Sequence, residues 1–292
     1  MGKGVALAFA SLAVRVGGRV PAALATPIGA DWQRQQAGWG TAHTLTLSVL
    51  DDKDRPGGRP VTAQTQNGPL AFRAEGEVFR TGGLTLETSA QGSQLGLSEE
   101  VAPGALLLAF TEVQRAAGLL PLHASVLSRG GLSRGGQTVA VSGPSGAGKS
   151  TAALRLLGRG WQLVAEDWAW LDPVSGQLLG WDSGLRLRPE SLERFAPELL
   201  QGAPTDQHGK RVLDPPRLNG AQALDAIFFL SAHSSAPRPD GSRLELVRSV
   251  WGMVGTPLTP AARRCTQTGV NTLMGGVPME LIDRDELIER LG

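Results

Sequence analysis

The sequence predicts an α/β fold in two parts, a small β-rich domain over residues 1–102 and a larger α/β domain over residues 103–292. Three observations support this division. The first hundred residues show short apolar alternations typical of strands, helical periodicity begins at 103–117, and strand and helix signals alternate from there on. A length of 292 residues suits one large domain or two modest ones.

Composition indicates a folded protein and argues against a nucleic-acid partner. Hydrophobic residues make up 41% and charged residues 19% of the sequence, which is a globular balance. The formal net charge is +1 and neither sign forms a long run, so no extended polyanion-binding surface is expected. The single cysteine, Cys265, cannot form an internal disulfide, which fits a reducing compartment.

The N-terminal apolar run predicts a strand rather than a membrane anchor. From Val5 to Val14 it is far shorter than the roughly 20 residues that span a bilayer. Arg15 and Arg19 interrupt the pattern of a secretory signal. We therefore expect a first β-strand here, no membrane partner and a cytoplasmic location.

The remaining elements are predicted from apolar periodicity. In the first part the strand candidates are LAVRV, TLTLSV, LAFRAEG and LTLETSA, and 103–117 predicts a helix that ends at Gly118. Residues 201–217 are polar, contain three prolines and predict a loop. In the second part we predict strands at 123–128, 138–143, 162–167, 226–230, 244–247 and 277–282, and helices at 149–158, 191–200, about 259–274 and 283–292.

A glycine-rich segment between a predicted strand and a predicted helix points to a phosphate site. Residues 143–151, GPSGAGKST, match the pattern GxxxxGK[ST]. In such a loop backbone N–H groups face the phosphates, the lysine reaches the β- and γ-phosphate oxygens, and the serine hydroxyl coordinates Mg²⁺. The sequence therefore predicts a bound nucleoside triphosphate, with magnesium on Ser150. The predicted binding residues are Gly143, Ser145, Gly146, Ala147, Gly148, Lys149, Ser150 and Thr151.

Two acidic residues follow the loop at the end of the next predicted strand. Glu166 and Asp167 lie at its C-terminal end, where ligands of an open α/β sheet bind. Phosphoryl transfer requires carboxylates for magnesium and, in a kinase, a base for the acceptor hydroxyl. The pair is the candidate for both tasks, and a solvated strand end is the alternative. His123 lies at the start of strand 123–128. By itself, a histidine in this position is as consistent with a core or surface residue as with a functional one.

The run LPLHASVLSRGG, followed by TVAVSGPSGAGKSTAALRLLGRGWQLVAEDWAWLD, resembles the catalytic domain of the HPr kinase/phosphorylase family and its kinase-like relatives. Three features carry the resemblance: His123 upstream of the loop, the SGxSGxGKS form of the loop, and the segment from Arg159 to Asp167. The resemblance implies an HPr kinase-like P-loop fold over 103–292 and use of ATP. It also implies that Glu166 acts as base or acid, that Asp167 binds the metal, and that His123 interacts with the first acid.

Departures from the family narrow what the resemblance implies. Glu166 replaces the usual aspartate, which adds a methylene and displaces the carboxylate. No EVRG-type signature follows, so the reverse, phosphate-dependent reaction is not implied. The N-terminal region is similar to that of relatives found with peptide-modification systems, which favours an acceptor other than HPr. The family forms oligomers, so a homo-oligomer is left open. Further basic candidates for contacts to phosphates or acceptor are Lys210, Arg186, Arg188 and Arg217.

We therefore expect a magnesium-dependent kinase that transfers the γ-phosphoryl group of ATP to a Ser or Thr hydroxyl on a small protein or peptide. Two alternatives stay open. The same acids serve a small-molecule hydroxyl kinase, since phosphoryl transfer asks mainly for positioning and charge stabilisation. The second alternative is a nucleotide-binding regulatory module without phosphotransfer, because Glu166 stands where the family usually has an aspartate. The sequence does not identify the base of the nucleotide.

Overall fold

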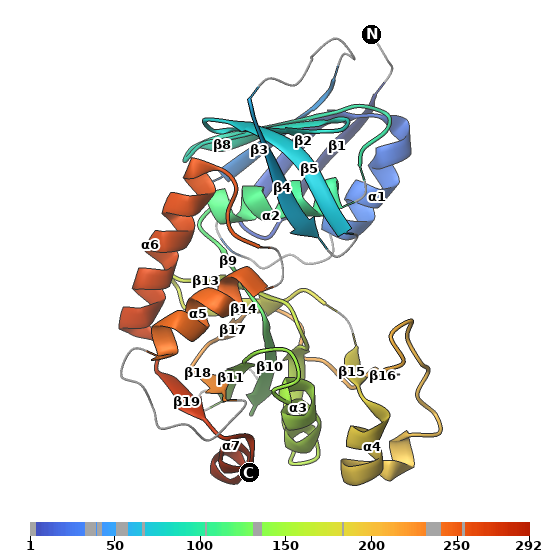
Figure 1. Ribbon diagram of the computed structural model, residues 1–292, viewed down its shortest axis with the longest axis vertical. Helices are drawn as coiled ribbons and strands as arrows, with labels where there is room; N and C mark the ends of the chain where they lie inside the picture. The colour runs from blue at the N-terminus through green and yellow to red at the C-terminus, as the bar shows by residue number, and fades with distance from the viewer. Residues whose placement is uncertain are drawn as a thin grey trace. The chain divides into compact units, whose positions relative to one another are not determined.

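The computed structural model describes residues 4–32, 39, 43–50, 58–65, 68–102, 104–130, 136–182, 184–231, 241–252 and 255–292. The protein is mixed α/β with several sheets, as the sequence predicts at that level (Figure 1). Two compact units share the chain: Met1–Pro121 with Val254–Asn271, and Leu122–Met253 with Thr272–Gly292. Among the described helices, none combines the length and the apolar character needed to cross a membrane.

The first unit contains an eight-stranded sheet in the order β1-β2-β3-β8-β7-β6-β5-β4. β2, β3 and β8 pair in parallel, and the other neighbours are antiparallel. Alternation along β3 buries His43, Leu45 and Leu47 on one face and exposes the residues between them. The strands are β1 (Val5–Ser11), β2 (Val14–Val20), β3 (His43–Val49), β4 (Arg59–Thr65), β5 (Gly68–Glu75), β6 (Val78–Thr81), β7 (Leu84–Thr88) and β8 (Gly92–Leu97).

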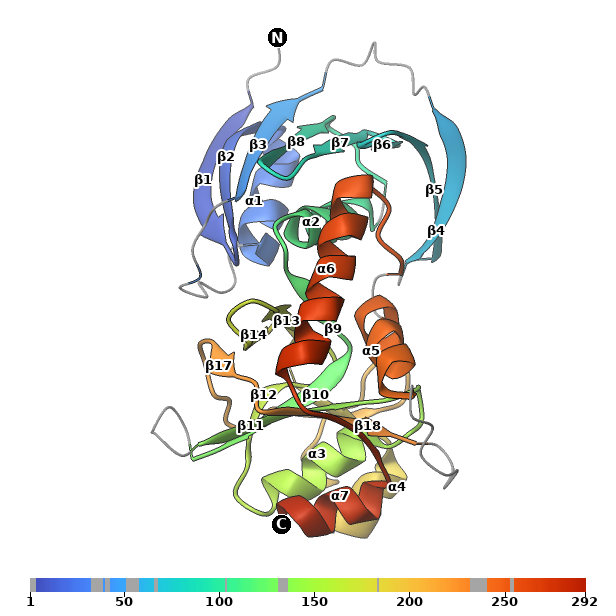
Figure 2. The same ribbon diagram turned by 90° about the vertical axis from the view of Figure 1, so that its left-hand side faces the viewer.

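Two helices lie on the concave side of this sheet (Figure 2). α1 (Ala22–Trp32) contacts β1, and α2 (Ala105–Ala116) contacts β7 and β8. α2 confirms the helix predicted at 103–117, and Gly118 follows it with φ 96°. Because α2 packs on this sheet, the first compact unit extends past residue 102 to Pro121.

Two features of the first unit differ from the sequence prediction. The first strand expected between Val5 and Val14 is present but ends at Ser11, because Leu12 adopts φ 51° and the chain turns there between β1 and β2. α1 was not predicted at all. It contains Pro27 in its interior, and only Ile28 and Trp32 of its residues are buried, so its sequence carries a weak helical pattern.

The second unit is built on a five-stranded sheet in the order β12-β10-β11-β18-β19. β11, β18 and β19 are parallel, while β10 runs antiparallel to β11 and β12. Helices α3 (Lys149–Leu157) and α7 (Arg284–Leu291) cover one face of it, and α5 (Gly241–Gly252) lies on the other (Figure 2). The strands are β10 (Ala124–Arg129), β11 (Gln137–Ser142), β12 (Gln162–Ala165), β18 (Ala226–Leu230) and β19 (Met279–Ile282).

Apolar strand and helix faces form the core under α3 and α7. Val139 and Val141 of β11 meet Leu156 of α3 and Ile288 of α7 in one buried cluster.

The other elements of the described residues include a four-stranded sheet in the order β17-β14-β13-β9, formed by β9 (Leu120–Leu122), β13 (Ala169–Asp172), β14 (Gln177–Gly180) and β17 (Gln222–Ala223). A two-stranded sheet pairs β15 (Leu185–Leu187) with β16 (Arg211–Leu213). The remaining helical elements are α4 (Pro189–Phe195), the 3₁₀ turn η1 (Pro197–Leu199) and α6 (Pro260–Gly276).

Most predicted elements of the second part are confirmed, with three corrections. The strand predicted at 244–247 is wrong: it is part of α5, in which Leu246 and Val250 are buried one turn apart while Leu244 is exposed. The helix predicted at 191–200 stops at Phe195, before Pro197. The predicted loop 201–217 contains β16, which pairs with β15.

Candidate functional site

The glycine loop lies between the end of β11 and the start of α3, as predicted. Gly143, Gly146 and Gly148 have φ angles of 149°, 84° and 97°, a region that other residues rarely adopt. A Cβ on Gly143 would also lie 2.9 Å from the carbonyl oxygen of Leu230. The glycine pattern is therefore required by the backbone path, and the first N–H groups of α3 are left for a ligand.

Lys149 is the first residue of α3 and is nearly buried. Its Nζ donates a hydrogen bond to the carbonyl oxygen of Gly143 at 3.1 Å. Burial lowers the pKa of Lys149, and the negative charges of Asp167 and Glu166 oppose that shift. The ammonium group is thus folded back over the loop, on the wall of the pocket described below.

Ser150 contacts the first acid of the pair. Its Oγ donates to Glu166 Oε1 at 2.7 Å. Glu166 follows β12 directly and is only 2% exposed; its Oε2 has no hydrogen-bond partner among the described residues and lies 3.7 Å from Arg186 Nη1. Burial raises the pKa of Glu166 to about 7, the charge of Asp167 adds to this, and the Ser150 hydrogen bond opposes it. This carboxyl group therefore changes its charge near neutral pH.

Asp167 contacts His123 rather than Ser150. The His123 Nε2 and Asp167 Oδ1 atoms are 3.2 Å apart. Burial by itself would raise the pKa of Asp167, but the hydrogen bond and charge of His123 and the charge of Lys149 outweigh it and lower the pKa. The family resemblance implied that His123 interacts with the first acid, Glu166, and this is wrong for the structure. The two acids therefore have different partners, Ser150 for Glu166 and His123 for Asp167.

His123 is held in place by its own backbone and by α5. Its N–H donates to the carbonyl oxygen of Ser249 at 3.0 Å, and its carbonyl oxygen accepts from Ser142 Oγ at 2.8 Å. A Cβ on Gly252 would lie 2.8 Å from His123 Nδ1, so α5 approaches the imidazole closely. The Nδ1 edge of the His123 ring thus packs against α5, while its Nε2 faces Asp167.

Asp182 is a site residue that sequence reasoning missed. It follows β14, and its carboxylate accepts the backbone N–H groups of both Glu166, at 3.1 Å, and Asp167, at 2.7 Å. Like the acid pair, it is an acidic residue close to the end of a short strand, two residues after Gly180, and that was the signal available in the sequence.

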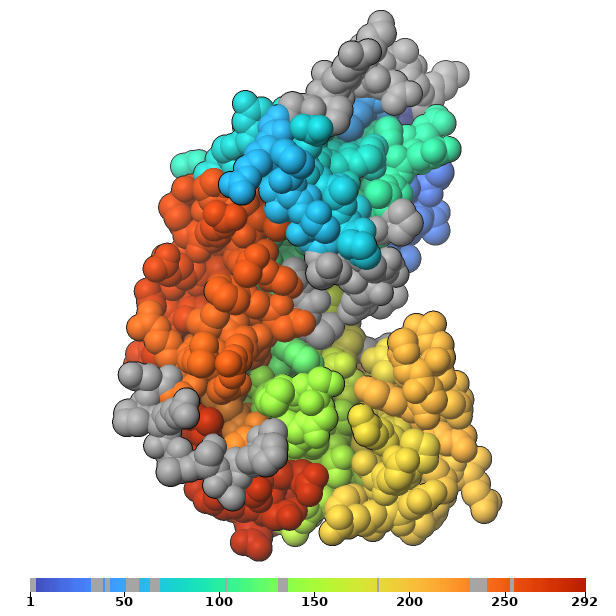
Figure 3. Space-filling model, viewed as in Figure 1, coloured from blue at the N-terminus to red at the C-terminus, as the bar shows by residue number. Residues whose placement is uncertain are grey.

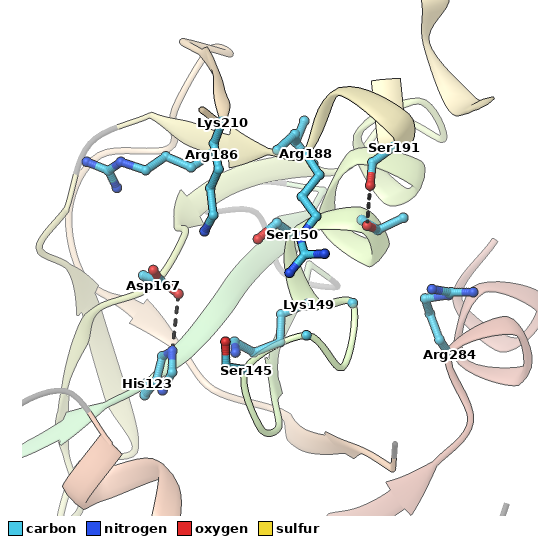
Figure 4. Close-up of a pocket in the computed structure, with 14 residues that line it drawn as sticks. His123, Ser145, Lys149, Ser150, Asp167, Arg186, Arg188, Ser191, Lys210 and Arg284 are labelled. Atoms are coloured by element: carbon cyan, nitrogen blue, oxygen red, sulfur yellow. Dashed lines mark hydrogen bonds and ion pairs between the residues drawn. The ribbon is translucent and has the colours of Figure 1, made fainter. Parts of the chain in front are cut away.

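The loop residues, Asp167 and His123 line a cavity of about 320 Å³. Figure 3 shows the green surface of the segment around α3 and the yellow surface of the segment from β15 to α4, which form two of its walls. In Figure 4 His123, Asp167 and Lys210 lie on one side of Lys149 and Ser150, while Arg188, Ser191 and Arg284 lie on the other. The lining residues are His123, Ser145, Gly146, Gly148, Lys149, Ser150, Thr151, Asp167, Arg186, Leu187, Arg188, Ser191, Lys210 and Arg284.

The cavity lining brings together most of the predicted site residues, with several differences. Gly143 and Ala147, two of the predicted loop residues, are not among the residues that line it. Glu166 does not line the cavity either and meets it through Ser150, its hydrogen-bond donor, and through Arg186, whose Nη1 lies 3.7 Å from its Oε2. Arg217 does not line it either; its Nη1 donates to the Asp182 carbonyl oxygen at 2.6 Å. Arg284, which was not predicted, comes from the start of α7 and lies next to Gly148. Five lysine and arginine side chains, Lys149, Arg186, Arg188, Lys210 and Arg284, therefore line the cavity with one carboxylate, Asp167.

Comparison with known proteins adds no family to this geometry. No protein-family model matches the sequence, and no curated protein sequence matches it.

Proposed function

We propose that this chain is a magnesium-dependent kinase of the HPr kinase type that transfers the γ-phosphoryl group of ATP to a Ser or Thr hydroxyl of a small protein or peptide. The observation that carries the proposal is the combination of a glycine loop at a helix N-terminus with two adjacent acids, one bonded to Ser150 and the other to His123. A P-loop domain formed by the second compact unit, and a β-rich domain formed by the first, are part of the same proposal.

The cationic lining supports a polyphosphate ligand. Backbone N–H groups at the start of α3 and the positive end of its dipole favour an anion there. Lys210 lies on one side of Lys149, and Arg188 and Arg284 lie on the other (Figure 4); Arg186 lines the cavity as well. The negative charge of a triphosphate exceeds that of most small metabolites, so it matches five cations better than a single carboxylate or phosphate does.

Ser150 and Glu166 fit a magnesium ion. Both offer hard oxygen donors, and the buried Oε2 of Glu166 has no hydrogen-bond partner among the described residues. Within the described ranges no three His, Cys, Asp or Glu side chains gather into a metal site, so the fit is to an ion whose coordination phosphates and water complete. When bound, magnesium neutralises charge on the β- and γ-phosphate oxygens.

Asp167 is the better-placed proton acceptor of the two acids. It lines the cavity, its side chain is 33% exposed, and His123 orients its carboxylate. With this assignment Glu166 and Asp167 exchange the roles that the family resemblance implies.

The proposed step is an in-line displacement. The acceptor oxygen forms a bond to the γ-phosphorus while the bond from that phosphorus to the β–γ bridging oxygen breaks, and the hydroxyl proton passes to the Asp167 carboxylate. Lys149 stabilises the charge on the transferred group, and ADP leaves.

Transfer of label tests this function. Purified protein is incubated with Mg²⁺, γ-labelled ATP and Ser- or Thr-containing peptides or small proteins encoded beside its gene, with Lys149→Ala as the control. We expect label on a hydroxyl of one acceptor with the wild type and none with the variant. Label on a small hydroxy compound instead would favour a small-molecule kinase. Label found only in unreacted ATP or free phosphate, for all acceptors, would contradict the proposal and favour a nucleotide-binding module.

A further inference from the structure

We propose that Asp182 is a positioning residue that fixes the backbone of Glu166 and Asp167 and so keeps their side chains on separate partners. Each oxygen of its carboxylate accepts one of the two consecutive N–H groups, at 3.1 and 2.7 Å. Asp182 does not line the cavity and takes no part in the proposed transfer. Its effect on catalysis rests on the proposed function, whereas its effect on the geometry does not.

The acid pair needs such an anchor because it lies beyond the end of a strand. β12 is the edge strand of its sheet and stops at Ala165, so the ladder with β10 does not bind the next two N–H groups. Buried N–H groups require an acceptor, and hydrogen bonds to a charged acceptor are stronger than those to a neutral one. The Glu166 carbonyl oxygen is held as well, since it accepts from Ser125 Oγ at 2.8 Å.

Asp182 is itself held on several sides. A Cβ on Gly180 would lie 1.9 Å from the Val164 carbonyl oxygen, so only glycine lets the end of β14 come this close to β12. The next residue, Trp181, donates its N–H to the Trp168 carbonyl oxygen at 2.8 Å. Arg217 Nη1 donates to the Asp182 carbonyl oxygen at 2.6 Å. The carboxylate is therefore fixed before any ligand binds.

One anchor thus controls both sides of the site. Glu166 and Asp167 are adjacent and point to Ser150 and His123 respectively. A rotation of the peptide between them would move both carboxylates from their partners at once. The glycine loop, in contrast, is carried by β11 and α3, and among the described residues the Asp182 carboxylate bonds the N–H groups of Glu166 and Asp167 rather than the loop. Loss of Asp182 should therefore impair magnesium-dependent binding and spare the contact of the loop with phosphates.

The test compares Asp182→Ala and Asp182→Asn with Asp172→Asn as a matched control. The Asp172 carboxylate also accepts a backbone N–H, from Val174 at 3.0 Å, but in the turn between β13 and β14 and outside the cavity lining. Calorimetry measures the affinity for ATP with and without Mg²⁺. We expect Asp182→Ala to reduce the gain in affinity from Mg²⁺ by about 10- to 100-fold, with Mg²⁺-free affinity within about twofold of the wild type. The loss for Asp182→Asn should be smaller, because an amide oxygen still accepts one N–H, and the control should be unchanged.

Crystal structures of the same variants give a readout that does not depend on activity. We expect the Ser150–Glu166 and His123–Asp167 hydrogen bonds to be lost in Asp182→Ala. If both bonds persist and the gain from Mg²⁺ is undiminished, the proposal is overturned; if Asp182→Ala does not fold, Asp182→Asn decides by the same criteria. If the wild type transfers no phosphate to any acceptor, the proposed function is contradicted. The crystal structures of the variants still decide whether Asp182 positions Glu166 and Asp167.

Discussion

Two buried glutamates, one in each compact unit, have very different surroundings. In the first unit Glu112 of α2 is fully buried and has partners at both oxygens: Oε1 accepts from Arg115 at 3.1 Å, and Oε2 accepts from Leu258 N, Thr259 N and Thr259 Oγ1 at 2.9, 3.0 and 3.3 Å. In the second unit Glu166 is 2% exposed, but only its Oε1 has a hydrogen bond, from Ser150.

The difference separates a structural carboxylate from one available for chemistry. A buried charge that is completely paired holds backbone in place and has nothing left to bind. One that is incompletely paired costs stability, and such a cost is typical of functional sites. The open oxygen of Glu166 is therefore the feature by which it differs from Glu112.

Removing the fully paired carboxylate should have the largest effect on stability. Glu112→Ala leaves Arg115 buried without its carboxylate and strands the N–H groups of Leu258 and Thr259. We expect the free energy of unfolding in urea to fall by about 3–5 kcal/mol. As a control, Thr259→Val removes only hydroxyl contacts, to Glu112 and from Ala262 N, and should cost about 1 kcal/mol. Equal losses in the two variants would show that the carboxylate is not the centre of this network.

Neutralising the Glu166 carboxylate should increase the free energy of unfolding, whereas removing Glu112 should decrease it. Burial raises the pKa of Glu166 from 4.5 to about 7, so the folded protein binds this proton more tightly than the unfolded chain. The resulting stabilisation is complete below pH 4.5 and is lost as the pH rises through 7. Glu166→Gln cannot titrate, so we expect it to be more stable than the wild type by about 3 kcal/mol at pH 8 and similar at pH 4. Urea denaturation at both pH values measures this. A variant less stable than the wild type at pH 8 would count against a strained Glu166.

The smallest effect is expected at the cation beside Glu166. Arg186 lies 3.7 Å from Oε2, and its charge lowers the pKa of Glu166. Arg186→Ala should therefore raise the pKa of Glu166 further. Because magnesium binding requires the ionised carboxylate, the affinity for ATP with Mg²⁺ falls as the pH is lowered, and in this variant the fall should begin at a higher pH than in the wild type. Because Arg186 is 38% exposed, stability should change by less than about 1 kcal/mol.

Calorimetric titrations from pH 6 to 9 measure the midpoint of this pH dependence. Arg188→Ala is the control: Arg188 lines the same cavity and has no ion pair with Glu166 among those of the described residues. Its loss should weaken binding at every pH without moving the midpoint. An unmoved midpoint in Arg186→Ala would show that this pair does not influence the acid.

Local patterns account for what the sequence predicted of the fold. Strands β11 and β18 are short apolar runs, and the loop before α3 is fixed by glycines that its backbone requires. The failures have equally local causes. The segment 244–247 fits a strand and one helical turn equally well, and only the burial of Leu246 and Val250 decides between them. α1 buries too few of its side chains to produce a clear periodicity.

The site was predictable where residues act through a motif and not where they act through tertiary contacts. Lys149 and Ser150 follow from the loop, and the acid pair follows from its place at a strand end. Which acid faces which partner depends on the register at the end of β12, which a sequence does not give. Asp182 acts through main-chain N–H groups and Arg284 arrives from the last helix, so neither belongs to a motif.

In the proposed mechanism the two adjacent acids divide the chemistry, with Asp167 accepting the proton and Glu166 acting with Ser150 at the magnesium. The most direct test is single-turnover transfer of the γ-phosphoryl group to the identified acceptor by Asp167→Asn and Glu166→Gln, together with ATP affinity in Mg²⁺. We predict that Asp167→Asn slows transfer by about 10²- to 10⁴-fold with unchanged affinity, whereas Glu166→Gln lowers affinity in Mg²⁺. Undiminished transfer by Asp167→Asn, with the loss confined to Glu166→Gln at saturating ATP and Mg²⁺, would contradict it.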